Sequence, residues 1–129
     1  PYKGIYNAFI GYDETLSHII YAGADFLLMP SRVEPCGLNQ MYSLRYGTIP
    51  IVRSIGGLKD TVTDIAEKGG FGICHKNTDV LEINEAIDRA VELYKNKTIF
   101  NKIRKQIMKI DHSWDASAQE YITLYESIN

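Results

Sequence analysis

The residues best suited to chemistry lie in the stretch 30–40, which begins Pro-Ser-Arg-Val-Glu-Pro-Cys-Gly and places a carboxylate at Glu34. This stretch follows a short apolar run, Phe26 to Met29, of the kind that a strand buried on both faces needs. Pro30 ends the strand pattern because proline has no N–H to donate to a neighbouring strand. A buried strand, a loop with a carboxylate and a helix N-terminus together predict a ligand site at the edge of an open α/β sheet.

Two side chains near such an edge each have two open interpretations. The carboxylate of Glu34 suits hydrogen bonds to sugar hydroxyls or the stabilisation of a developing positive charge, but an ordinary solvated loop residue fits the position equally well. Tyr12 follows Gly11 at the end of another predicted strand. Its ring either stacks on a nucleobase or belongs to the hydrophobic core.

Glycines precede two predicted helices, at Gly37 and Gly57. Free N–H groups and the positive end of the helix dipole suit an anion such as a pyrophosphate at these places. The alternative is that glycine only permits a tight turn between a strand and a helix. Neither place fits G-x-G-x-x-G or G-x-x-x-x-G-K-[ST], so a dinucleotide site or a Walker site is not predicted.

The residue types that bind metals are scattered, and we expect no metal site. Three histidines share no metal-ligand spacing with the two cysteines: these are His18, His75, His112, Cys36 and Cys74. The cysteines lie in different apolar contexts, which favours separately buried, reduced thiols over a disulfide. No nucleophile elbow, Ser-His-Asp order or paired-carboxylate spacing is present.

Length and charge narrow the classes of protein. With 129 residues the chain is one domain at most, large enough to bury a core. A formal net charge of −2 gives no electrostatic basis for binding nucleic acid or an anionic membrane. No apolar run approaches the ~20 residues that a membrane span requires. We therefore expect a cytoplasmic protein.

The elements that must position these residues alternate between strand and helix. Strands are predicted at Ile5–Ile10, Asp25–Met29, Ile49–Val52 and Phe71–Cys74. Helices are predicted after Asp13, from Leu38 to a C-cap at Gly47, from Asp60 to Glu67, from a capping box at Asp79 and Glu82, from Ile99 to Ile110 and from a cap at Ser113. This order predicts an α/β fold, a Rossmann-like three-layer α/β/α arrangement with a small parallel sheet followed by C-terminal helices. A sheet so small leaves an unpaired edge, so we expect the chain to be part of a larger protein.

The motif segments closely resemble bacterial glycogen synthases and plant starch synthases. The likeness is carried by residues 30–40 with Tyr42, by Tyr46-Gly47-Thr48-Ile49-Pro50, and by Gly56-Gly57-Leu58-Lys59-Asp60-Thr61-Val62. It extends back to Gly11-Tyr12-Asp13 and His18, and forward through Gly70-Phe71-Gly72 to Ser113-Trp114 and Tyr121. The resemblance implies a GT-B architecture, in which two Rossmann-like domains face each other across a cleft. Residues 1–129 would be the C-terminal part of the second, nucleotide-sugar-binding domain.

The resemblance also implies an activity. Members of this family transfer glucose from ADP-glucose to the non-reducing end of an α-1,4-glucan, with retention and without a metal or other cofactor. By motif position, Glu34 would contact the donor glucose and stabilise positive charge at its anomeric carbon, as an electrostatic and positioning group rather than a nucleophile. The donor would also be held by main-chain contacts from Cys36, Gly37 and Leu38, by the first helical turn with Asn39, and by stacking of Tyr12 on adenine.

One departure from related families helps to choose among them. Many other retaining GT-B transferases carry a second acid eight residues after the first, and here that position is Tyr42. This favours a glycogen or starch synthase over a sucrose-, trehalose- or cell-wall-type transferase. The alternatives are a retaining GT-B transferase with another donor or acceptor, and a non-catalytic Rossmann-type nucleotide-binding module.

The resemblance further predicts which parts of the site lie elsewhere. The family's Lys-x-Gly-Gly-Leu loop, a catalytic-site His and the basic residues for the diphosphate belong upstream of Pro1. The N-terminal domain is thus the expected partner of this chain. We expect the polypeptide as given to have no synthase activity and to bind ADP-glucose weakly or not at all. Its location would be the cytoplasm, or the plastid in a plant.

Overall fold

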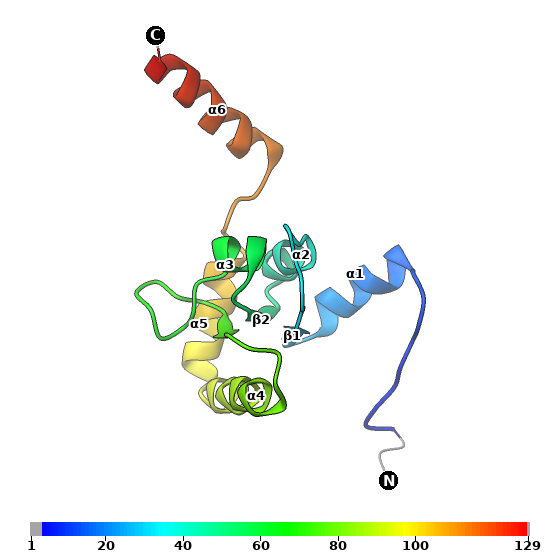
Figure 1. Cartoon of the computed structure of the whole chain (residues 1–129). Helices are drawn as coiled ribbons and strands as arrows, with labels where there is room; N and C mark the ends of the chain where they lie inside the picture. The colour runs from blue at the N-terminus through cyan, green and yellow to red at the C-terminus, as the bar shows by residue number, and fades with distance from the viewer. Residues whose placement is uncertain (1–3, 129) are drawn as a thin grey trace.

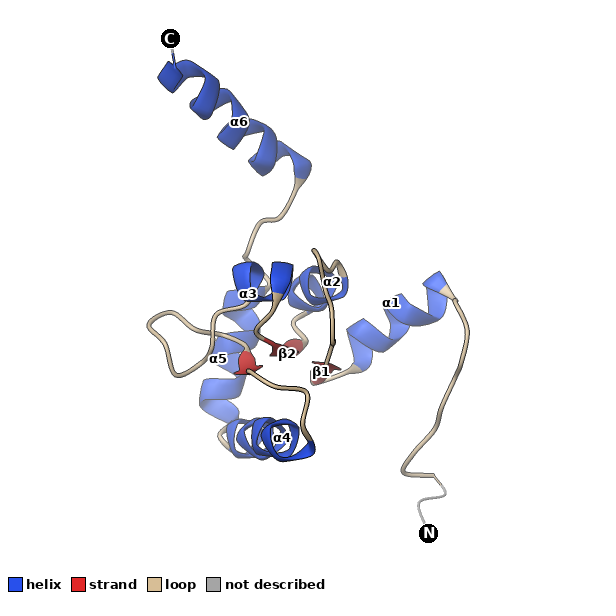
Figure 2. Ribbon diagram, viewed as in Figure 1, coloured by secondary structure: helices blue, strands red, loops and turns tan. Residues whose placement is uncertain are grey.

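The computed structural model describes residues 4–128 as a small parallel sheet with helices around it (Figures 1 and 2). The sheet has the order β1-β2-β3, and both pairs of neighbouring strands are parallel. The strands are β1 (Phe26–Met29), β2 (Ile49–Arg53) and β3 (Ile73–His75), and the helices are α1 (Glu14–Gly23), α2 (Asn39–Tyr46), α3 (Gly56–Thr61), α4 (Val80–Lys95), α5 (Lys97–Ile107) and α6 (Trp114–Ile128).

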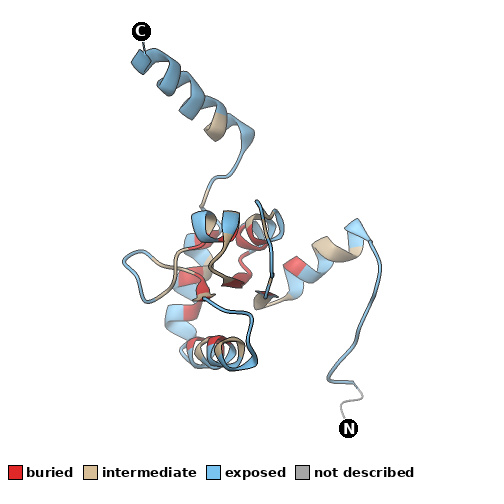
Figure 3. Ribbon diagram, viewed as in Figure 1, coloured by how far each residue is buried: buried red, intermediate tan, exposed pale blue. Residues whose placement is uncertain are grey.

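Two hydrophobic clusters lie on opposite faces of the sheet, because successive side chains of a strand point to opposite sides. On β2, Ile49 and Ile51 belong to the larger cluster, which they share with residues of α4 and α5 such as Ala90. Val52 belongs to the smaller cluster, with Leu58 of α3. Figure 3 shows the buried residues concentrated in the sheet and on the helix faces that meet it. The predicted three-layer, Rossmann-like α/β fold is confirmed.

Local signals placed several helix ends correctly. Asp13 caps α1 by accepting the N–H of Leu16 at 2.9 Å, and Gly47 ends α2 with a left-handed φ of 77°. Asp79 caps α4 by accepting the N–H of Glu82. The return bond of a capping box is not made, because the carboxylate of Glu82 accepts the N–H groups of residues 76 and 77 instead.

Two predicted elements are wrong. Residues 5–10 form no strand; Ile10 is 99% exposed, and β1 pairs only with β2 among the described residues, so no sheet edge takes up the backbone of this segment. The helix predicted from Asp60 to Glu67 instead lies at α3. It ends at Thr61 because Val62 is extended, and Asp64 then forms an isolated parallel bridge with Gly72.

Helix α6 forms as predicted from the Ser113 cap, whose Oγ accepts the N–H of Ala116 at 3.2 Å. It projects away from the sheet (Figure 1), and none of its described residues is buried. Its large apolar side chains are therefore exposed, with Trp114 at 90%. The predicted helix before it, from Ile99 to Ile110, begins at Lys97 and ends at Ile107 as α5.

Candidate functional site

The candidate site is built on residues 30–38, which we call the Glu34 loop, between the carboxyl end of β1 and the start of α2. The predicted position of Glu34 at this edge of the sheet is confirmed. Its side chain is half-buried, and the hydroxyl of Ser31 donates to Oε2 at 3.5 Å. The carboxylate thus keeps most of its accepting capacity for another group.

A pair of glycines at the start of α3 supports this loop from the neighbouring strand end. The N–H of Gly57 donates to the carbonyl of Pro35 at 3.2 Å. A Cβ on Gly56 would collide with the carbonyl oxygen of Glu34, and one on Gly57 with that of Cys36. Close approach of two backbones therefore requires glycine here. Of the two interpretations of Gly57, the anion site is wrong, because its N–H is already used within the protein.

Gln40 holds the same loop from below, and sequence reasoning missed this role. Its side chain is fully buried, and Nε2 shares its two hydrogens among three acceptors: the carbonyls of Cys36 at 3.2 Å and Gly37 at 2.9 Å, and Oγ1 of Thr61 at 3.1 Å. Gly37 has a left-handed φ of 74°, and a Cβ there would lie 2.6 Å from Oε1 of Gln40. The only feature of the sequence that could have indicated this role is that Gln40, a long polar residue, lies in the first turn of a helix that must pack on a sheet.

The N-terminus of α2 is open. Within residues 4–128, the N–H groups of Gly37, Leu38 and Asn39 have no hydrogen-bond acceptor, and no side chain caps the helix. Unpaired amides at the positive end of a helix dipole suit an anion. Beside them, the carboxylate of Glu34 can accept hydrogen bonds from hydroxyl groups. This edge can therefore hold a ligand that carries both an anionic group and hydroxyls.

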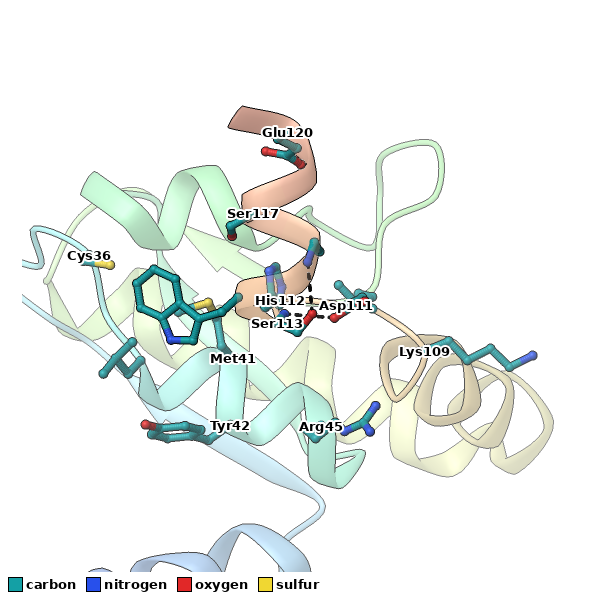
Figure 4. A pocket seen from close by; sticks show the side chains of 14 residues that line it. Cys36, Met41, Tyr42, Arg45, Lys109, Asp111, His112, Ser113, Ser117 and Glu120 are labelled. Atoms are coloured by element: carbon teal, nitrogen blue, oxygen red, sulfur yellow. Dashed lines mark hydrogen bonds between the residues drawn. The ribbon is translucent and has the colours of Figure 1, made fainter. Parts of the chain in front are cut away.

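The six predicted site residues are not gathered in one cavity. Tyr12 is 90% exposed, so its core interpretation is wrong, and it shares a hollow of about 350 Å³ with Asn39. Cys36 and Leu38 line a second hollow of about 940 Å³ that reaches the start of α6 (Figure 4). Glu34 and Gly37 line neither hollow. The residues are spread along one edge of the sheet, around the N-terminus of α2.

The two hollows meet at Tyr42, which lines both. This ring lies in an aromatic cluster between α1 and α2, with ring centroids 6.0 Å from His18 and 6.1 Å from Tyr21. Nδ1 of His18 lies 3.1 Å from the hydroxyl oxygen of Tyr46. Burial, with Tyr42 nearby, raises the pKa of Tyr21. The cluster packs α1, which begins just after Tyr12, against α2, which begins at Asn39.

Both cysteines are free thiols. Cys74 is partly buried, and burial raises its pKa to about 11. Cys36 is exposed on the Glu34 loop, so the expectation that both thiols are buried is wrong for this one. Across the part of the chain that the structure describes, no group of three His, Cys, Asp or Glu residues could hold a metal ion. Over the same residues, no helix is long and apolar enough to cross a membrane.

Comparison with known proteins agrees with this architecture. The family model described as "Glycosyl transferases group 1" matches residues 7–107. A glycogen synthase from Flavobacterium johnsoniae is 59% identical over 127 residues, which are 98% of this chain and 27% of the relative. A glycogen synthase from Kosmotoga olearia is 48% identical over 95% of this chain and 26% of its own length.

A solved structure shares the fold. The catalytic domain of Starch Synthase IV from Arabidopsis thaliana, bound to ADP and acarbose, has a TM-score of 0.82 and 41% identity over 92% of this chain. The chain covers 25% of that structure, and thus spans about a quarter of the length of the relatives it matches.

The fold is that of a Rossmann-like domain, and it matches the second domain of GT-B glycosyltransferases. The chain belongs to the group 1 glycosyl transferases and, within them, to the glycogen and starch synthases.

Proposed function

We propose that the protein containing this chain transfers glucose from ADP-glucose to the non-reducing end of an α-1,4-glucan with retention. Residues 1–129 would form the C-terminal part of its nucleotide-sugar-binding domain. Family membership and the glycogen synthases among the relatives support the reaction. The ADP bound in the starch synthase structure supports the choice of donor nucleotide.

The observation that carries this proposal is the position of Glu34 beside the open N-terminus of α2. The amides of residues 36–38 would bind the donor's diphosphate and glucose, with Asn39 in the same helical turn. Glu34 would accept hydrogen bonds from the glucose and stabilise positive charge as the bond to the leaving group breaks. Tyr12 is exposed at the neighbouring hollow, where its ring would stack on adenine.

The openness of this edge supports a second part of the proposal. Tyr12 and Leu38 are largely exposed, and Glu34 lies in neither hollow. A site that excludes water needs a cover, and the N-terminal domain of the same protein would provide it together with the remaining catalytic and acceptor-binding groups. The chain by itself would then be inactive and would bind ADP-glucose weakly. We further propose that the protein works in the cytoplasm without a metal ion and without binding nucleic acid.

The role of Glu34 is tested in a chimera in which residues 4–128 replace the matching segment of the Flavobacterium johnsoniae glycogen synthase. Glu34→Ala is expected to lower kcat by roughly 10²–10³-fold, as expected for the loss of a charge that stabilises the transition state. Glu85→Ala, at an exposed position of α4, is the matched control and should leave turnover unchanged. Wild-type turnover in the Glu34→Ala chimera would overturn the assignment.

The donor is tested by comparing turnover with ADP-glucose, UDP-glucose and GDP-mannose in the same chimera. ADP-glucose is expected to give the largest kcat/KM, and an equal or larger value with UDP-glucose would overturn that choice. Turnover that persists in EDTA is expected for chemistry without a metal. A chimera that folds and binds nucleotide but transfers no sugar would favour the non-catalytic nucleotide-binding module instead.

A further inference from the structure

The residue that brings the strand ends together is Arg53, the last residue of β2. In the sheet it pairs with His75 of β3, while the preceding Val52 pairs with Met29 of β1. Its half-buried side chain therefore leaves the sheet at its carboxyl edge, between the loops that follow the two outer strands.

Three backbone carbonyls accept from this one guanidinium. Nη1 donates to Arg32 at 2.7 Å and to Ser31 at 3.4 Å, both in the Glu34 loop. Nε donates to Lys76 at 2.9 Å, in the loop that follows β3. A planar guanidinium can donate along several fixed directions at once, whereas a lysine ammonium lacks this fork. Arg53 thus connects the loop that carries Glu34 to the far side of the sheet.

The acceptor on the far side is itself fixed. The carboxylate of Glu82 in α4 accepts the N–H groups of Lys76 and Asn77, both at 2.8 Å. Hydrogen bonds from Asn77 hold the pKa of Glu82 below its usual value, so this anchor is charged at neutral pH. His75 adds a contact of 2.8 Å between Nδ1 and the carbonyl of Asn77. Arg53 therefore ties the Glu34 loop to a segment that is itself held by the capped helix α4, not to a free loop.

The other hydrogen bonds to the Glu34 loop hold its second half, so that Arg53 is the residue that holds its first half. Gly57 holds the carbonyl of Pro35, and Gln40 holds those of Cys36 and Gly37. Within residues 4–128, no other side chain donates to the carbonyls of residues 31 and 32. Without Arg53, the segment immediately before Glu34 loses its only side-chain anchor among the described residues.

The geometry points to Arg53 as a positioning residue for Glu34. It sets the path of residues 31 and 32, and through them the place of the carboxylate relative to the N-terminus of α2. This inference rests on the proposed function for its catalytic consequence, but its structural part does not. A small displacement of a catalytic group is enough to lower turnover strongly, because bound reactants must be held close to the reacting geometry.

The structural part is tested by NMR relaxation on the full chain. Arg53→Gln removes the bonds to both loops, and the backbone order parameters across residues 31–34 are expected to fall from roughly 0.85, the value of a rigid backbone, to below about 0.6, the value of a flexible one. Arg104→Gln is a matched control, because this half-buried arginine donates from Nε to the carbonyl of Gly47 at the opposite end of β2. Equal order parameters of the Glu34 loop in both variants would overturn the inference.

The catalytic part is tested in the glycogen synthase chimera, with rates corrected for the folded fraction. Arg53→Gln is expected to lower kcat at least tenfold while KM for ADP-glucose changes by less than about twofold, because the group displaced acts in the transition state. Arg53→Lys should retain more turnover than Arg53→Gln but less than the unchanged chimera. Arg104→Gln should leave kcat unchanged. When Glu34→Gln is already present, adding Arg53→Gln should lower kcat little further, because both changes remove the same contribution of the Glu34 carboxylate.

Additive losses in that double variant would overturn positioning through Glu34. Full turnover of Glu34→Gln alone would contradict the proposed function instead. In that case lower order parameters of the Glu34 loop in Arg53→Gln would still support the anchoring of the loop, so the two failures are distinguishable.

Discussion

Two turns of this molecule look alike in sequence and differ in structure. Each follows a buried parallel strand and opens a helix, with glycine close to the helix start: the Glu34 loop with Gly37 leads into α2, and residues 54–55 lead into α3, which begins with Gly56 and Gly57. In the first, the N–H groups at the start of the helix have no acceptor among the described residues. In the second, the N–H of Gly57 is bonded to the backbone of the first turn. One turn is open to a ligand, and the other supports it.

A helix N-terminus that follows a strand is therefore not by itself a binding site. At α3 the N–H of Gly57 donates to a neighbouring loop, and packing against that loop requires both glycines of the helix start. The amides at α2 stay free because Gln40 turns the carbonyls of the preceding residues downward into the protein. The turn before α2, which is open to a ligand, is thus held in place by two groups: the turn before α3, which we call closed because the N–H of Gly57 is bonded within the protein, and the buried side-chain amide of Gln40.

Alanine at the closed turn should have the largest effect on stability. Gly57→Ala places a Cβ against the carbonyl of Cys36, and since neither backbone can move without breaking the turn, we expect a loss of about 3–5 kcal/mol in the free energy of unfolding. Gly37→Ala meets only the end of the Gln40 side chain but has a left-handed φ, and should cost about 1–2 kcal/mol. Urea unfolding monitored by circular dichroism gives both values.

Gly23→Ala is the control for these two changes. It lies at the end of α1, where a Cβ would meet nothing within 4 Å, and should change stability by less than about 1 kcal/mol. If Gly37→Ala proved as damaging as Gly57→Ala, the distinction between an open and a closed turn would fail.

The sequence predicts most of the elements but not the difference between the turns. Strands β1 and β2, the cap at Asp13 and the end of α2 at Gly47 follow from local apolar runs and caps, which act within a few residues. The partner of the Gly57 amide is Pro35, distant along the chain, so no local rule shows that it is used. The same is true of Gln40 and Arg53, whose roles depend on carbonyls that a tertiary contact brings near.

The remaining misses have the same origin. Residues 5–10 have the composition of a strand, but a strand needs a partner edge and the described structure gives it none. For Tyr12, sequence left open whether the ring is buried or exposed, and only the path of that segment decided it. The family resemblance supplied the candidate site residues, and their roles stay predictions.

Gln40→Ala should have the second-largest effect. The change removes the side-chain donor to the part-buried carbonyls of Cys36 and Gly37 and leaves a cavity where the fully buried Gln40 side chain lay, so we expect a loss of about 2–3 kcal/mol. Asn39→Ala, next to it and exposed, should change the free energy of unfolding by less than about 0.5 kcal/mol. Comparable losses in the free energy of unfolding in both variants would show that the buried Gln40 side chain has no special role in holding the Glu34 loop. Chemical unfolding of the two variants in parallel measures this.

The loop after the closed turn adds a pH-dependent contribution. Burial acts to raise the pKa of Asp64, but hydrogen bonds from Arg89, Ala66 and Cys74 outweigh it and hold the pKa below its usual value of 3.8. A carboxylate with a lowered pKa stabilises the fold above its unfolded value, and this stability is lost as pH falls through the folded value. We expect Asp64→Asn to cost about 1–2 kcal/mol at pH 6.

This difference between wild type and Asp64→Asn should shrink steadily below pH 3.8. Unfolding free energies measured from pH 6 down to pH 2.5 give the curve. Asp88→Asn, at an exposed position of α4, serves as the control and should not show the same convergence. A difference that stays constant over the whole range would mean that the Asp64 carboxylate is not the group that titrates.

The two thiols give the comparison with the smallest effect on stability. Cys36 is exposed on the open turn, while Cys74 is partly buried with its pKa raised to about 11. At pH 8 only about one Cys74 in a thousand would be a thiolate, the form that reacts. Alkylation with iodoacetamide followed by mass spectrometry should therefore modify Cys36 first. That modification should shift the free energy of unfolding by less than about 0.5 kcal/mol, because the side chain faces solvent. Faster modification of Cys74 would mean that the sheet around β3 opens more readily than the Glu34 loop, and the expected order of exposure of the two thiols would be wrong.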